Sequence, residues 1–189
     1  IKTDQEAALR GLVSEVQRRR AKENLETIVE ESKVYDSQSN GVGERAVQTV
    51  ECITRTHKLA LENKLRKLIP SGHPIMTWLV EHCADLLNKY KVNKNGRTAL
   101  EAIRGKPYNG EMFEFGIKVY HMHPGKPQGG SMKARWGTGL FLGKVWSSDE
   151  CMIFDCDSGK LLKARSIKLL VESESWVASD VDEMNVFRY

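Results

Sequence analysis

The stretch Asp36-Ser37-Gln38-Ser39-Asn40-Gly41-Val42-Gly43-Glu44-Arg45 marks a change from turn to helix. Its first part is rich in residues that favour turns. From about Val42 to Ile69, apolar residues then recur at helical spacing, and Pro70-Ser71-Gly72 ends the pattern. The stripe consists of Val47, Val50, Thr54, His57, Leu61, Leu65 and Leu68. The sequence therefore predicts its longest helix here, with Glu44 in the first turn.

Upstream of this stretch, a short strand and a second helix are expected. Ile1 to Thr3 are typical of the last residues of a strand, and Asp4 follows them directly. Open α/β sheets place functional groups at the carboxyl ends of strands, so Asp4 is a candidate site residue. Both acids also have structural interpretations, because Asp4 can cap the following helix and Glu44 suits a helix N-terminus.

Downstream of the stretch, the pattern changes from helical to β. A helix is expected over 74–90, and Thr98-Ala99-Leu100-Glu101 is a capping box for a short helix that Gly105 closes. After Pro107, short apolar segments alternate with turns, including Asp157-Ser158-Gly159-Lys160 as a hairpin turn. The expected strands are Phe115–His121, Thr138–Val145, Cys151–Asp155 and Leu161–Ile167. The prediction is an α/β chain with a mostly helical region at 1–110, a small β-module at 111–170 and an acidic tail at 171–189.

Composition places the chain among soluble globular proteins. Hydrophobic residues make up 40% and charged residues 29%, and no apolar run approaches the roughly 20 residues needed to span a bilayer. The net charge of +4 is unevenly distributed, with basic groups at 18–22, 55–67 and 89–106. These groups suit a polyanionic partner, although solvated helix faces give the same pattern. Four scattered cysteines are too few for a disulfide scaffold, which favours an intracellular location.

Several motifs occur in the order found in one family. The quoted stretch resembles the Gln-x-Asn-Gly-x-x-Glu-Arg segment of integrases from copia-type retrotransposons and retroviruses, and Lys2-Thr3-Asp4-Gln5-Glu6 is similar to their earlier acidic segment. The likeness spans about residues 1–170. It continues through Gly96-Arg97-Thr98-Ala99-Leu100-Glu101, Gly105-Lys106-Pro107, Phe115-Gly116, Phe141-Leu142-Gly143, Asp157-Ser158-Gly159-Lys160 and Arg165-Ser166-Ile167.

The resemblance implies a fold, a chemistry and a set of partners. The fold would be part of a ribonuclease-H-like core followed by a small SH3-like β-barrel, from a retrotransposon Pol polyprotein. Asp4 and Glu44 would be two of three acids that bind Mg²⁺ (or Mn²⁺) for phosphodiester strand transfer. The third acid would precede Ile1, so this chain alone is expected to be inactive. DNA would be the partner, contacted by Arg45, Arg55 and Lys58. Self-association and a nuclear location are also implied, with no membrane and no small-molecule substrate.

Other interpretations of the sequence remain open. The chain can be a non-catalytic remnant that binds nucleic acid or protein. Aromatic residues of the β-module, Trp136, Phe141 and Trp146, can form either a binding platform or the core of a small barrel. His121-x-His123 and Cys151-x4-Cys156 contain zinc ligand types, but the long gap between the pairs disfavours a shared site.

Overall fold

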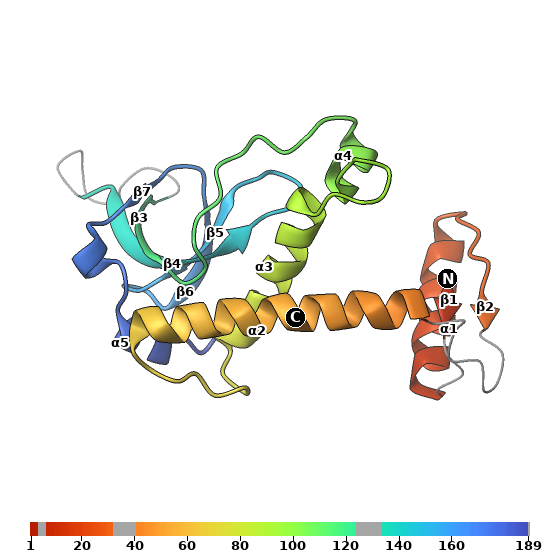
Figure 1. Ribbon diagram of the computed structural model, residues 1–189, viewed down its shortest axis with the longest axis horizontal. Coiled ribbons are helices and arrows are strands. Elements are labelled where there is room, and N and C mark those ends of the chain that lie inside the picture. Colours follow the sequence, from red (N-terminus) through yellow and green to blue (C-terminus); the bar gives the residue numbers. More distant parts are fainter. Residues whose placement is uncertain (4–6, 32–40, 124–133, 189) are drawn as a thin grey trace. The chain divides into compact units, whose positions relative to one another are not determined.

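The structure is a computed structural model that describes residues 1–3, 7–31, 41–123 and 134–188 (Figure 1). It divides into two compact units, Ile1–Thr49 and Val50–Tyr189. At the coarsest level, the predicted mixture of helices and strands is confirmed. No helix in the described ranges is both long enough and apolar enough to cross a membrane.

The first unit contains a parallel β-α-β arrangement. Strands β1 (Lys2–Thr3) and β2 (Glu30–Glu31) pair in parallel, with Lys2 opposite Glu30 and Thr3 opposite Glu31. Helix α1 (Ala7–Lys22) connects them and buries Val13. Parallel strands need such a crossover connection. The expected strand end at 1–3 and the helix after it are confirmed.

Helix α2 (Gly41–Leu65) begins as predicted but ends earlier than the apolar stripe. Arg66 adopts a left-handed backbone conformation with φ of 52°, which stops the helix. The Glu62 carboxylate then accepts the backbone N–H of Ile69 at 2.7 Å. Leu68 is consequently 81% exposed rather than part of the buried face.

The next two helices agree closely with the sequence patterns. Helix α3 (Ile75–Tyr90) buries Ile75, Leu79 and Cys83. Helix α4 (Ala99–Arg104) is capped by Thr98, whose hydroxyl accepts the N–H of Glu101 at 3.1 Å. Gly105 ends α4 in the left-handed conformation, with φ of 74°, where a side chain would be strained.

The β-region is a five-stranded antiparallel sheet in the order β6-β5-β4-β3-β7. The strands are β3 (Lys118–Met122), β4 (Trp136–Lys144), β5 (Cys151–Asp155), β6 (Lys160–Ala164) and β7 (Ile167–Leu169). The segment predicted as one strand at 161–167 is therefore divided between the two edge strands. Only Arg165 and Ser166 separate β6 from β7, a link that spans about 10 Å. The edges of a flat five-stranded sheet lie about 19 Å apart, so this sheet must be strongly curved.

Each face of the sheet covers a separate hydrophobic cluster. Leu140 and Phe154 pack in one cluster with residues of α2 and α3, including Leu79. Val119, Phe141 and Ile153 form the other. The two faces differ because side chains alternate along a strand.

The C-terminal segment packs against this unit. The 3-10 helix η2 (Glu172–Glu174) and α5 (Ala178–Asp182) lead to Met184, which is buried in the cluster with the helices. The Trp78 indole N–H donates to the carbonyl of Val186 at 2.9 Å. Two acids of the C-terminal segment pair with lysines. Asp180 pairs with Lys118 at 2.7 Å, and Asp182 pairs with Lys67. The region predicted as an acidic tail thus contributes to the core.

Candidate functional site

The two predicted metal-binding acids both belong to the first unit. Asp4 lies outside the described residues, but it directly follows β1 in the chain. Glu44 lies in the first turn of α2 and is exposed, with no hydrogen-bond or ion-pair partner among the described residues. Because β1 and β2 are parallel, their carboxyl ends lie at the same edge of the pair. The assignment of these acids to a metal site stays a prediction.

The three predicted DNA-contacting residues have different surroundings on α2. Arg45 is exposed, and Arg55 is exposed beside Glu51, with a nitrogen–oxygen distance of 3.5 Å. Lys58 pairs at 3.0 Å with Glu62, whose side chain is 6% exposed. The N–H of Ile69 and the ammonium of Lys58 lower the pKa of Glu62. Lys58 therefore already has a structural partner, and its DNA contact stays a prediction.

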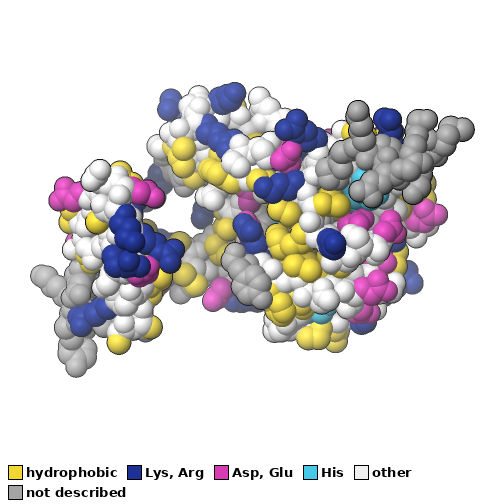
Figure 2. Space-filling model, turned by 180° about the vertical axis from the view of Figure 1, so that it is seen from behind, with side chains coloured by type: hydrophobic (Ala, Val, Ile, Leu, Met, Phe, Trp, Pro, Cys, Tyr) yellow, Lys and Arg dark blue, Asp and Glu magenta, His cyan; other side chains and the backbone are white. Residues whose placement is uncertain are grey.

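A group of basic side chains lies at the end of α1 in the first unit. Figure 2 shows dark-blue atoms gathered in one area of this unit, and the last turns of α1 carry the exposed residues Arg18, Arg19, Arg20 and Lys22. Arg18 and Arg19 both bind Glu15, and these hydrogen bonds lower the pKa of Glu15 to about 2. By contrast, Lys89 from the predicted basic group at 89–106 is buried. It pairs with Asp85 at 2.7 Å and lies 4.3 Å from the centre of the Tyr108 ring.

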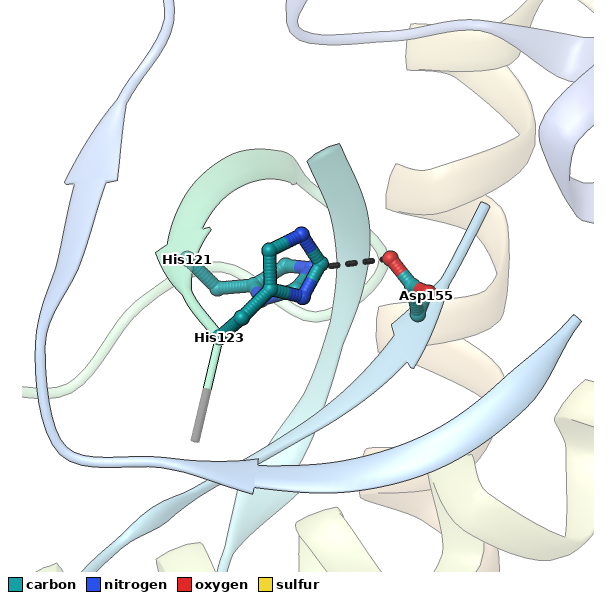
Figure 3. A group of neighbouring side chains, drawn as sticks. All are labelled: His121, His123 and Asp155. Carbon is teal, nitrogen blue, oxygen red and sulfur yellow. Dashed lines mark hydrogen bonds and ion pairs between the residues drawn. The ribbon is translucent and has the colours of Figure 1, made fainter. Parts of the chain in front are cut away.

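A group of side chains that can hold a metal ion lies on the sheet of the second unit (Figure 3). His121 lies near the end of β3, His123 directly follows that strand, and Asp155 is the last residue of β5. Their ligand atoms lie within 4.8 Å of one another. The two imidazole rings meet edge to face, with centroids 4.9 Å apart. His121 is completely buried and Asp155 is 3% exposed, whereas His123 is exposed.

Gly137 on β4 leaves room for side chains from β3 and β5 to meet across this strand. Gly137 pairs with His121, and Gly139 pairs with Asp155. A β-carbon on Gly137 would lie 2.7 Å from Nε2 of His123 and 3.2 Å from Nε2 of His121. Any side chain there would therefore occupy the space in which the two imidazoles lie. The lack of a side chain at Gly137 therefore opens the site.

Hydrogen bonds fix the orientation of the carboxylate. Nε2 of His121 lies 3.0 Å from Oδ1 of Asp155, while Oδ2 accepts the N–H and the hydroxyl of Ser158. Burial alone would raise the pKa of Asp155, but the hydrogen bonds from Ser158 and His121 outweigh burial and lower it. Nδ1 of His121 is buried and has no hydrogen-bond partner among the described residues.

The geometry agrees that the histidine pair and the cysteine pair share no site. The histidines meet Asp155 rather than the two cysteines. Cys151 lies at the other end of β5, about 13 Å along the strand from Asp155. Cys156 packs in the cluster with the helices, and burial and nearby Asp180 raise its pKa to about 12. The sequence patterns did not reveal Asp155, because strand register brings it to the histidines. The spacing of His and Cys motifs does not specify that register. The pattern Gly137-x-Gly139 was the available signal.

The aromatic residues considered as a binding platform are separated by the fold. Phe141 is completely buried in the sheet core, as the core interpretation expects. Trp146 is 44% exposed and lies beside the guanidinium of Arg104, 5.0 Å from the ring centre. It also lines a cleft of about 520 Å³ between α3 and β4. The three rings therefore do not form one surface.

A scan against protein-family models gave no match, and a search of curated proteins found no similar sequence. The function is therefore inferred from the residues and geometry of the chain itself.

Proposed function

We propose that this chain is part of a retroelement integrase that binds DNA and contributes Asp4 and Glu44 to a Mg²⁺-dependent strand-transfer site. One observation carries the proposal: the parallel β1-α1-β2 arrangement is followed by a helix with an acid in its first turn. Asp4 directly follows β1, and both acids belong to the unit Ile1–Thr49. A strand-end acid and a helix-start acid are the arrangement that the family resemblance implies.

The residue types fit a site for Mg²⁺. Mg²⁺ prefers oxygen ligands and keeps several waters, so a few carboxylates are sufficient protein ligands. The Glu44 carboxylate is exposed and is not engaged by a described residue. When bound, paired Mg²⁺ ions would activate the attacking oxygen and stabilise the leaving oxygen. Asp4 and Glu44 would orient the ions, and Arg45 and Arg55 would contact the phosphates of DNA.

The proposal also concerns the β-region, and the curved sheet of β3–β7 supports the expected SH3-like barrel there. A ribonuclease-H-like core in this family is followed by an SH3-like barrel, and a five-stranded antiparallel sheet with linked edges has the required curvature. We assign this sheet to that barrel. Self-association and action in the nucleus belong to the same proposal.

A non-catalytic nucleic-acid-binding remnant is the second candidate. The exposed basic residues on the last turns of α1 favour it, because they provide phosphate contacts that need no metal ion. The two candidates differ in whether Asp4 and Glu44 bind a divalent cation.

The test measures Mn²⁺ binding to the full 189-residue chain by paramagnetic broadening of NMR signals. We expect Mn²⁺ to broaden amide signals near the start of α2, and Asp4→Asn and Glu44→Gln each to weaken Mn²⁺ binding at least tenfold. Glu51→Gln is the matched control, because Glu51 is an exposed glutamate two turns further along the same helix. Mg²⁺ should compete with Mn²⁺.

DNA binding is measured on the same proteins at several salt concentrations. Salt-sensitive binding that Mg²⁺ strengthens in the wild type, but not in Glu44→Gln, supports the integrase proposal. Equal Mn²⁺ binding by the wild type and Glu44→Gln overturns it. If Mn²⁺ binding is equal and DNA binding is still salt-sensitive, the result supports the non-catalytic candidate.

A further inference from the structure

We propose that His121, His123 and Asp155 form a binding site for a divalent transition-metal ion, Zn²⁺ foremost. The site lies in the second unit and involves neither Asp4 nor Glu44, so it does not depend on the proposed strand-transfer function. It would join the end of β3 to the end of β5 across β4.

The distances match those of a zinc site with a small movement of one ligand. Zinc bonds of about 2.0–2.1 Å place the ligand atoms of a tetrahedral site about 3.3 Å apart. Nε2 of His121 and Oδ1 of Asp155 are already 3.0 Å apart. All the ligand atoms lie within 4.8 Å of one another, so a ligand needs to move by at most about 1.5 Å. His123 is exposed, and rotation about its side-chain bonds supplies this movement.

The ligand types select the class of metal. Two imidazole nitrogens and one carboxylate oxygen suit zinc and its neighbours in the first transition row. Mg²⁺ prefers a set of oxygen ligands and is disfavoured here. Three protein ligands leave a fourth position for water. The site is therefore chemically distinct from the all-oxygen site proposed around Glu44.

The surroundings of the group are those of a prepared site. Ser158 holds the second oxygen of Asp155, which leaves the first oxygen directed at His121. Such outer hydrogen bonds orient metal ligands in proteins. Gly137 keeps the space beside both Nε2 atoms free of a side chain.

Metal binding would stabilise the sheet. The ion binds a native arrangement of three side chains that the unfolded chain does not hold together, so binding shifts the equilibrium toward the folded state. A free-metal concentration of a hundred times the dissociation constant should raise the melting temperature of the unit by about 5–10 °C.

The test uses the full chain, freed of metal with a chelator and titrated with Zn²⁺ or Co²⁺. We expect one Zn²⁺ per chain, a visible d–d spectrum for bound Co²⁺, and a rise in melting temperature. His123→Gln should weaken Zn²⁺ binding at least tenfold without unfolding the chain, because His123 is exposed. His57→Gln is the matched control, since His57 is a histidine of the same unit outside the group. It should bind Zn²⁺ as the wild type does.

Two further variants separate this site from the one around Glu44. Glu44→Gln should leave Zn²⁺ binding unchanged, and His123→Gln should leave the Mn²⁺ broadening of signals near the start of α2 unchanged. Gly137→Ala should weaken Zn²⁺ binding, because its methyl group would occupy the space beside both imidazoles. The proposal is overturned if the wild type shows no Zn²⁺-dependent rise in melting temperature. It is also overturned if His123→Gln and the wild type bind Zn²⁺ equally.

Discussion

The two units place their candidate functional groups in different ways. In Ile1–Thr49, the acids are defined by local features, the end of a strand and the first turn of a helix, and α1 buries Val13. In Val50–Tyr189, two hydrophobic clusters support a curved sheet, and His121, His123 and Asp155 meet from segments that are distant in the sequence. Local patterns are sufficient to propose the first candidate group, whereas strand register is needed to find the second.

The largest expected effect comes from the core of the second unit. Phe141 is completely buried, so Phe141→Ala should lower the free energy of unfolding by about 3–5 kcal/mol. All four tryptophans, Trp78, Trp136, Trp146 and Trp176, belong to the second unit, so their fluorescence in urea reports on that unit. Val13→Ala in the first unit should leave this fluorescence transition unchanged. Equal shifts from both variants would show that the units unfold together.

An effect of intermediate size is expected from His82. Burial, with smaller contributions from His57 and Lys89, lowers the pKa of His82 to about 4. The ordinary value in an unfolded chain is about 6.5, so the unfolded state binds more protons between these two values. The stability of the second unit should fall as the pH is lowered from about 6.5 to about 4, by about 3 kcal/mol in total.

His82→Leu isolates this contribution. The variant cannot take up a proton at this position, so the difference in unfolding free energy between wild type and variant should change with pH over the same window. Urea unfolding followed by tryptophan fluorescence at several pH values measures it. A difference that is constant from pH 7 to pH 4 would contradict the assignment.

The smallest expected effect is the difference in stability loss between substitutions of Lys58 and Arg55 on α2. Lys58→Gln should lower the free energy of unfolding by about 1–2 kcal/mol, because the buried Glu62 loses a charged partner. Arg55→Gln, one turn away, should change it by less than about 0.5 kcal/mol. Urea unfolding of both variants provides the measurement. Equal stability losses would mean that Lys58 has no special structural role.

Much of the fold could be predicted because its signals are local. Pro74 and the apolar stripe after it predict α3, Thr98 and Gly105 define both ends of α4, and the turn at 157–160 predicts the hairpin of β5 and β6. Each signal uses residues a few positions apart, where sequence spacing alone decides which side chains meet.

The remaining features depend on contacts that spacing does not specify. Lys89 belongs to a basic group in the sequence, yet Asp85 and the distant Tyr108 ring enclose it. Asp155 reaches His121 only because Gly137 leaves β4 without a side chain between them. Helix α2 ends early because of the left-handed conformation of Arg66, whereas the apolar stripe in the sequence continues beyond that residue. Tertiary contacts override the local pattern in the first two cases, and a local backbone conformation does so in the third.

The short link between the edge strands determines the order in which the sheet can assemble. Strands β4, β5 and β6 join through neighbouring segments of chain, so their hairpins close early at little entropic cost. Strand β7 follows β6 directly but pairs with β3, a partner far earlier in the sequence. That pairing is a non-local contact of the kind that slows folding. The sheet is therefore complete only when β7, which Arg165 and Ser166 link to β6, has paired with β3.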